Sequence, residues 1–134
     1  MSSEEISIPT SGRGLYLITD SVLKSLPDLP ENGLLNCFIP HTSASLLIQE
    51  NADPTAREDL EVFLNRLIPD GEAWHRHTLE GADDTTAHMK AALTSTSLNI
   101  PIREHRLALG TWQGIYLWEH RQASHQRRLL LTVI

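Results

Sequence analysis

The sequence contains a single cysteine, Cys37, among its 134 residues. One thiol cannot form an intramolecular disulfide, and it cannot supply the several sulfur ligands of a cysteine-based zinc site. Any metal site in this chain must therefore use histidine and carboxylate ligands. Because Cys37 lies in an apolar segment, we expect it to pack in the core.

Long hydrophobic runs and a surplus of basic residues are also missing. No apolar stretch approaches the roughly 20 residues that span a bilayer, and Met1 to Thr10 lacks the basic start and apolar centre of a signal peptide. We therefore expect a cytoplasmic protein with no membrane partner. The 11 basic and 17 acidic residues give a net charge of -6. A nucleic-acid partner is not expected, because binding to phosphate backbones depends on lysine and arginine.

Aromatic residues make up only 5% of the chain, whereas histidine occurs seven times. Histidine is the side chain best suited to proton transfer near neutral pH and to metal ligation. The histidines are therefore the first candidates for a functional site. The length of the chain predicts one domain over residues 1–134.

The spacing of apolar residues predicts both helices and strands. Asp53 and Pro54 combine a capping side chain with proline at the first helical position, and apolar residues then recur every three or four positions. A second amphipathic helix is expected to follow a cap at Asp83 or Asp84 and to end near residue 93. The polar segment 72–80 predicts a loop. Strands are expected over residues 6–8, 14–19, 33–39, 43–49, 97–103, 113–120 and 127–134, and a short helix over residues 20–29.

These elements predict an α+β fold. About seven strands and two principal helices are expected to form a single compact domain with a curved or two-layer, mainly antiparallel β-sheet. No glycine-rich turn of the dinucleotide-binding type occurs, which disfavours a doubly wound parallel sheet. The last strand contains a continuous apolar run, so we expect it to be central or covered at an interface.

The first group of candidate residues is His41, Thr42 and Ser43, at the end of an apolar strand. Their hydroxyl groups can hydrogen-bond a ligand or orient the imidazole, and a polar cluster of this kind is costly unless it is satisfied. The alternative is a simple turn in which His41 ends the strand.

The second group surrounds Asp84 and His88, which are four residues apart and share one face of a helix. This spacing fits a carboxylate that orients a histidine, or two metal ligands. The helix start could also bind a phosphate through its backbone N–H groups. A capped helix with a solvated His88 is the alternative. His75 and His77 lie just upstream, in an arrangement that zinc sites use.

The third group lies in the segment from Gly110 to Gly114, where Thr111 and Gln113 stand between two glycines that permit a close backbone approach to a ligand. The alternative is a hairpin turn. Glu119 lies further along the same strand and in phase with Gln113, so it faces either solvent or the site. Six arginines near predicted strand or turn ends could gather around a phosphorylated substrate, although solvation is expected for most of them: Arg13, Arg103, Arg106, Arg121, Arg127 and Arg128.

Four motifs, in this order, make the sequence similar to the YjbQ-like family, which is also named for a secondary thiamine-phosphate synthase activity. The resemblance covers nearly the whole chain. The motifs are His41-Thr42-Ser43-Ala44-Ser45, Glu50-Asn51-Ala52-Asp53-Pro54, His77 followed by Glu80-Gly81-Ala82-Asp83-Asp84 and His88, and Leu109-Gly110-Thr111-Trp112-Gln113-Gly114-Ile115.

The resemblance implies a compact α+β homotrimer that binds a small phosphorylated substrate. It also implies weak thiamine-phosphate synthase activity, in which a phosphorylated thiazole is joined to a pyrimidine diphosphate and pyrophosphate is released. The positions that match the family are His41, His77 and His88, with Asn51, Asp83, Asp84, Thr111 and Gln113 around them. His75 stands where many members of the family have a tyrosine, two residues before the matching histidine, so it is an additional ring.

Three functions remain open from the sequence. In a transferase, His41, Asp84, His88 and Glu119 would carry the chemistry, while the substrate-binding residues would be Thr42, Ser43, Asn51, Asp83, Thr111 and Gln113. In a metal-dependent hydrolase, His41, His77 and His88 would hold a divalent ion, Zn²⁺ or Mg²⁺, with Glu119 or Asp84 as base. The third possibility is a non-catalytic trimer that binds a phosphorylated metabolite.

Overall fold

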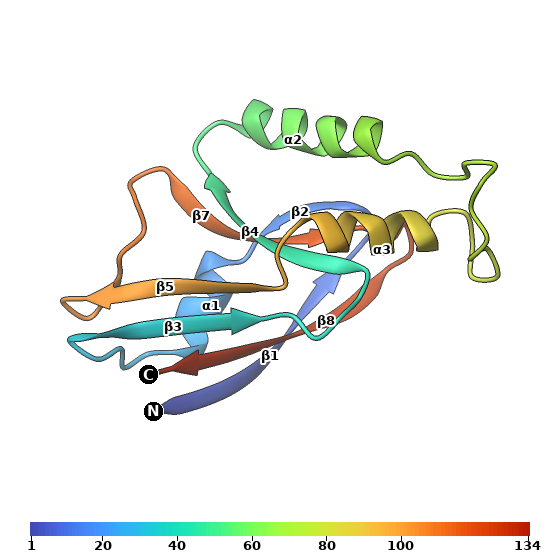
Figure 1. The fold of residues 1–134 in the computed structure, drawn as a ribbon. Coiled ribbons are helices and arrows are strands. Elements are labelled where there is room, and N and C mark those ends of the chain that lie inside the picture. The colour runs from blue at the N-terminus through green and yellow to red at the C-terminus, as the bar shows by residue number, and fades with distance from the viewer.

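The computed structural model of residues 1–134 contains eight strands in two antiparallel sheets (Figure 1). The larger sheet has the strand order β1-β8-β3-β5-β6, and the smaller one has the order β2-β7-β4. The α+β fold with a two-layer antiparallel arrangement is therefore confirmed. The strands are β1 (Ser2–Thr10), β2 (Gly14–Leu17), β3 (Asn32–Phe38), β4 (Ala44–Glu50), β5 (Ser97–Arg103), β6 (Arg106–Leu107), β7 (Gln113–Glu119) and β8 (His125–Val133).

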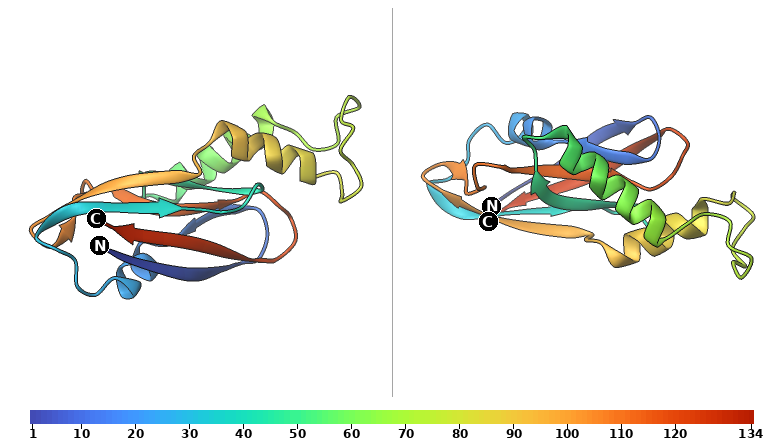
Figure 2. Two further views of the ribbon diagram at one scale, coloured as in Figure 1. Left: turned by 60° about the horizontal axis from the view of Figure 1, so that its bottom comes forward. Right: turned by 90° about the horizontal axis from the view of Figure 1, so that it is seen from above.

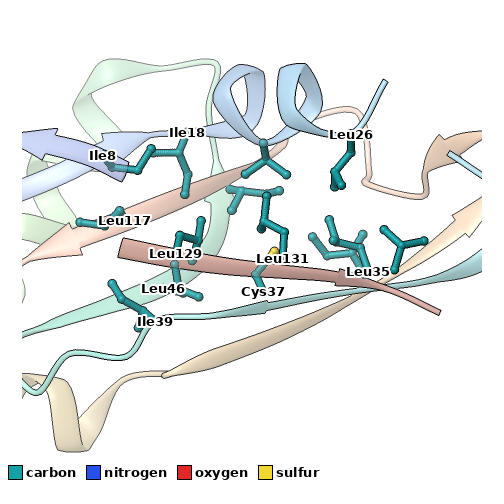
Figure 3. Packing of buried hydrophobic residues seen from close by; sticks show 14 of the residues in the cluster. Ile8, Ile18, Leu26, Leu35, Cys37, Ile39, Leu46, Leu117, Leu129 and Leu131 are labelled. Carbon is teal, nitrogen blue, oxygen red and sulfur yellow. The ribbon is translucent and has the colours of Figure 1, made fainter. Parts of the chain in front are cut away.

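The main core lies between the two sheets (Figure 3). Strand β8 pairs with both β1 and β3, so it is central, as its apolar run predicts. Alternate side chains of β8 point inward, and Leu129 and Leu131 are fully buried against Cys37 and other residues of the cluster. Burial raises the pKa of the Cys37 thiol to about 12, so this thiol is an inert packing residue.

Three helices accompany the sheets: α1 (Thr19–Ser25), α2 (Pro54–Leu67) and α3 (Asp84–Leu93). Figure 2 shows α2 and α3 on one side of the molecule and α1 on the other. Helix α2 begins as the sequence predicts, because the Asp53 carboxylate accepts a hydrogen bond from the Thr55 N–H at 2.9 Å. No helix is long and apolar enough to cross a membrane.

Helix α2 packs on the outer face of the smaller sheet. Its Leu64 is buried against Leu15, Tyr116 and Trp118, which project from β2 and β7. Three other apolar residues of α2 are half-exposed: Val62, Phe63 and Leu67. Between α2 and α3 the chain forms the predicted loop, which extends beyond the sheets (Figure 2).

Helix α1 is shorter than the sequence predicts. It ends at Ser25, two residues before Pro27, instead of continuing to residue 29. The expected cap is also absent, since the Thr19 hydroxyl accepts a hydrogen bond from the Ile115 N–H at 2.9 Å and not from the helix. A contact with β7 has therefore replaced a local cap.

Candidate functional site

His77, Asp84 and His88 meet at the start of α3. Their nearest ligand atoms all lie within 4.8 Å of one another. The Oδ2 atom of Asp84 is 2.7 Å from Nε2 of His77 and 3.3 Å from Nε2 of His88. Asp84 is almost fully buried, whereas both imidazole rings are partly open to solvent. The arrangement is a buried carboxylate flanked by two accessible imidazoles.

Helix α3 supplies two members of this group, and the preceding loop supplies the third. Asp84 and His88 share a face of α3 because they are four residues apart. His77 reaches them from the loop, and its ring centroid lies 5.3 Å from that of His88. His75 stays outside the group and packs edge-on against Trp74.

The backbone fixes the orientation of the His88 ring. Its Nδ1 lies 2.9 Å from the carbonyl oxygen of Thr42. A carbonyl only accepts, so Nδ1 carries a proton, and Nε2 is the ring nitrogen that faces Asp84. A histidine held in this way by a carbonyl is oriented as metal-ligating histidines usually are.

Arg121 holds the acidic side of the group. Its Nη1 donates to Oδ1 of Asp84 at 2.7 Å and its Nε donates to Oδ2 of Asp83 at 3.0 Å. The sequence predicts that Asp83 or Asp84 caps α3. Asp83 lies at the cap position, but its side chain makes no capping hydrogen bond, because its carboxylate faces Arg121 and the Gln122 N–H. Burial alone would raise the pKa of Asp84, but the hydrogen bond from His77 and the charges of His88 and Arg121 outweigh it and keep this pKa below its usual value.

A cavity of about 490 Å³ opens beside His88. It is lined by residues of α3 and of the segments that flank β4 and β5: His41, Thr42, His88, Ala91, Ala92 and Thr96. Burial lowers the pKa of His41, and the positive charges of Arg127 and Arg128 lower it further. Nε2 of His41 accepts a hydrogen bond from the Arg128 N–H at 2.9 Å. The proton of this neutral ring is therefore on Nδ1.

The residues fit a divalent metal ion, but the set differs from the one that the sequence suggests. Two imidazole nitrogens and one carboxylate oxygen are suitable ligands for Zn²⁺ and related ions. His77 and His88 are in both sets. The third candidate ligand in the structure is Asp84, whereas the sequence suggests His41. The Nε2 lone pair of His41 is already used by Arg128. His41 is thus better placed to contact a ligand in the cavity.

Glu119 is not available as a base. Its side chain is fully buried and forms an ion pair with Arg127, whose Nε donates at 2.7 Å. Burial would raise the pKa of Glu119, but hydrogen bonds from Arg127, the Thr10 hydroxyl and the Arg121 N–H more than offset it and hold the pKa below its usual value. At neutral pH this carboxylate is a charged structural group.

Ser43 belongs to the same buried network. Its hydroxyl accepts a hydrogen bond from Nη2 of Arg127 at 2.9 Å, and its side chain does not face the cavity lining. It is nevertheless adjacent to Thr42, whose carbonyl orients His88. The structure therefore gives Ser43 a supporting role in place of the substrate contact that the sequence suggests.

Asn51, Thr111 and Gln113 lie at the other end of the smaller sheet. In the β4 and β7 pair, Ala44 is opposite Glu119 and Glu50 is opposite Gln113. Because seven strand residues span about 20 Å, this end is far from His88 within one chain. Oε1 of Gln113 accepts from the Gly110 N–H at 2.8 Å, and the Asn51 N–H donates to the Trp112 carbonyl at 2.9 Å. These polar groups stabilise a turn, but it is not the hairpin turn that is the alternative for this motif, because β6 and β7 belong to different sheets.

The helix start is a poor phosphate site because the carboxylates of Asp83 and Asp84 stand beside it. Two negative charges there repel an anion. On the other side of the cavity, the positive charges of Arg127 and Arg128 act on His41, and the charge of Glu119 partly offsets them. An anion therefore meets less repulsion beside His41 than at the helix start.

Sequence reasoning missed the roles of Arg121, Arg127 and His120. The two arginines were expected to be mostly solvated, whereas Arg127 is buried and Arg121 is largely so. His120, the last residue of the strand predicted over residues 113–120, is fully buried, with Nε2 2.8 Å from the Ser45 hydroxyl and Nδ1 without a partner. No local pattern marks these residues, because their partners are remote in the sequence.

His120 is expected to make the stability of the fold pH-dependent. Burial lowers its pKa from 6.5 to about 3, and the charge of Lys90 contributes. Below pH 6.5 the unfolded chain binds a proton that the folded chain does not, so the free energy of unfolding falls with decreasing pH, by up to about 1.4 kcal/mol per pH unit. Urea unfolding between about pH 7 and about pH 4 measures this slope. His120→Gln places an uncharged amide near the Ser45 hydroxyl and should flatten this slope. An unchanged slope would contradict this account.

Comparisons with known proteins agree with this fold. Residues 4–134 match the family model described as "UPF0047 protein YjbQ-like". A UPF0047 protein of Synechocystis is 46% identical over 131 residues, which cover 97% of this chain and 89% of that protein. YjbQ of Escherichia coli is 43% identical and covers 96% of this chain and 94% of its own length. Among solved structures, a conserved hypothetical protein of Thermus thermophilus is 34% identical, with a TM-score of 0.87 over 98% of this chain and 99% of that one.

Proposed function

The chain belongs to the YjbQ-like UPF0047 family, and from this premise we propose that it is a metal-dependent enzyme for small phosphorylated substrates. The observation that carries the proposal is the group of His77, Asp84 and His88, whose His88 also lines the cavity that contains His41. A perturbed carboxylate, two accessible imidazoles and an adjoining cavity form the combination expected of an active site.

The protein residues would divide the work between the two sides of the cavity. His77, Asp84 and His88 would hold a divalent ion, which supplies charge neutralisation for phosphate oxygens when it is bound. His41 would donate its Nδ1–H to a phosphate oxygen, with the positive charge of Arg128 nearby. Ala91 and Ala92 offer an apolar wall for a heterocyclic ring.

The reaction we propose is the slow synthesis of thiamine phosphate that the family resemblance implies. The thiazole nitrogen forms a bond to the pyrimidine methylene carbon while the bond from that carbon to the pyrophosphate oxygen breaks. This step requires positioning of two substrates and stabilisation of a departing anion, and it needs no strong base. The absence of a free carboxylate base beside His41 is consistent with that requirement.

A metal-dependent hydrolase is the second candidate. Two histidines and one carboxylate leave positions open for water, and zinc hydrolases use such a donor set. The accessible faces of His77 and His88 favour this alternative. A non-catalytic binder would use the same cavity without turnover, and its ligand would only raise the thermal stability.

One set of assays separates these candidates. The purified protein, loaded with Zn²⁺ or Mg²⁺, is given the thiazole phosphate and the pyrimidine diphosphate, and thiamine phosphate and pyrophosphate are both measured. We expect equal amounts of the two products, with loss of turnover after chelation. Thiamine phosphate no higher than with the His88→Ala variant would rule out the synthase. Phosphate release from simple phosphate esters would favour the hydrolase.

We also propose that the chain is a cytoplasmic homotrimer. The half-exposed apolar side chains of Val62, Phe63 and Leu67 on α2 support self-association, because isolated chains seldom leave such groups together in water. Light scattering should then give about three times the chain mass of 15.0 kDa. A monomer at micromolar concentration would contradict the trimer and leave the proposed chemistry intact.

A further inference from the structure

Arg121 is bound at all three of its guanidinium nitrogens. Besides the contacts with Asp83 and Asp84, its Nη2 donates to the carbonyl oxygen of Glu80 at 2.9 Å. The Arg121 side chain is only 17% exposed. Because a planar guanidinium with three fixed acceptors has no freedom to turn, Arg121 is a rigid support for whatever it holds.

The two oxygens of Asp84 have different partners as a result. Oδ1 receives the short hydrogen bond from Arg121, and Oδ2 faces the imidazole nitrogens of His77 and His88. A carboxylate with one oxygen committed in this way has one oxygen left for a cation. Without Arg121, the Asp84 side chain could rotate and offer both oxygens.

We propose that Arg121 is a positioning residue that makes Asp84 a one-oxygen ligand and so directs the site toward ions that prefer nitrogen ligands, such as Zn²⁺ and Co²⁺, and away from Ca²⁺. This inference rests on the proposed metal site. Calcium requires six to eight oxygen ligands and often binds both oxygens of a carboxylate. Imidazole nitrogens are instead preferred by zinc and its neighbours. Two imidazoles and a single oxygen therefore favour the second class of ion.

Two variants separate the position of Arg121 from its charge. Arg121→Lys keeps a positive charge but cannot hold Asp83, Asp84 and the Glu80 carbonyl together. Arg121→Gln removes the charge as well. If orientation dominates, both variants should bind Zn²⁺ and Co²⁺ about 10- to 100-fold more weakly, the range expected for groups that support metal ligands. If charge alone mattered, Arg121→Gln would bind cations more tightly and Arg121→Lys would resemble the wild type.

The measurements are titration calorimetry with Zn²⁺ and Ca²⁺, and the visible absorption of bound Co²⁺, which reports its ligands. We expect the ratio of Zn²⁺ to Ca²⁺ affinity to fall in both variants and the Co²⁺ spectrum to change. Arg13→Gln is the matched control, because Arg13 makes a two-bond ion pair with Asp70, has a similar exposure of 18% and does not touch Asp84. This control should keep the wild-type affinity within about threefold.

The possible results distinguish this inference from the proposed function. If the wild-type protein binds neither Zn²⁺ nor Co²⁺, the metal site itself is wrong. If the wild type binds them and both Arg121 variants keep its affinities and spectrum, only the role of Arg121 is wrong. Should Arg121→Gln fail to fold, Asp83→Asn removes the charge of one anchor of Arg121 and leaves the contacts of Asp84 in place. It should weaken Co²⁺ binding in the same direction and by a smaller factor.

Discussion

Replacing His88 with alanine is expected to weaken zinc binding by at least about 100-fold and to abolish turnover. The reason is that the variant loses a metal ligand itself, which costs more affinity than the loss of a group that only supports a ligand. Replacing His41 with alanine should leave zinc affinity within about threefold of the wild type. His41 lies outside the group of ligand atoms, and its Nε2 is bonded to the Arg128 N–H. Turnover should still fall in the His41 variant, since a donor to the substrate is lost.

Calorimetry with Zn²⁺ and the thiamine-phosphate assay check both variants. His75→Ala is a suitable control, because His75 lies in the same loop as His77 but contacts Trp74. Equal losses of zinc affinity in the His41 and His88 variants would favour the ligand set with three histidines that the sequence suggests. The pair of variants therefore decides between Asp84 and His41 as the third ligand.

Breaking the buried ion pair of Glu119 and Arg127 is expected to cause the largest loss of stability in this fold. Arg127→Met leaves the Glu119 carboxylate buried without its main partner, which typically costs about 3–5 kcal/mol of unfolding free energy. The pKa of Glu119 is lowered in the folded protein, so the stabilisation by this group is present at neutral pH and is lost as the pH falls through that pKa.

Urea unfolding at neutral pH measures this loss. Arg128→Met is the matched control, because Arg128 is the next residue on β8, points to solvent and pairs with Glu5 only at 3.5 Å. Its cost should stay below about 1 kcal/mol. The double variant Glu119→Gln with Arg127→Met should recover part of the stability, since neither buried charge then remains. If Arg127→Met were no less stable than Arg128→Met, the pair would have no structural role.

Sequence reasoning was most accurate where the interactions are local. The cap at Asp53, the spacing of Asp84 and His88 and the buried run of β8 all depend on residues within a few positions of one another. Helix and strand periods set these distances, so the sequence is sufficient to infer them. The family was likewise recognisable from the order of the motifs.

Sequence reasoning was least accurate where the register of the sheets decides which motifs meet. The order of motifs gives no reason to separate Asn51 and Gln113 from His41. The antiparallel pairing of β4 with β7 puts Glu119 beside Ala44 and Gln113 beside Glu50, so the motifs are divided between the two ends of one sheet. The assignment of Asn51 and Gln113 to substrate binding stays a prediction. It would require a site that a second copy of the chain completes.

The composition of the sequence, with one cysteine and seven histidines, determined by itself that any metal must be held by histidine and carboxylate groups. The helix period likewise determined that Asp84 and His88 are neighbours. Only the tertiary structure decided that Asp84 joins His77 and His88 and that Arg121, 37 positions after Asp84 in the chain, orients it. The physical reason is that helical spacing follows from bond geometry. Contacts between remote segments follow from how the two sheets and α3 pack, which no short stretch of sequence encodes.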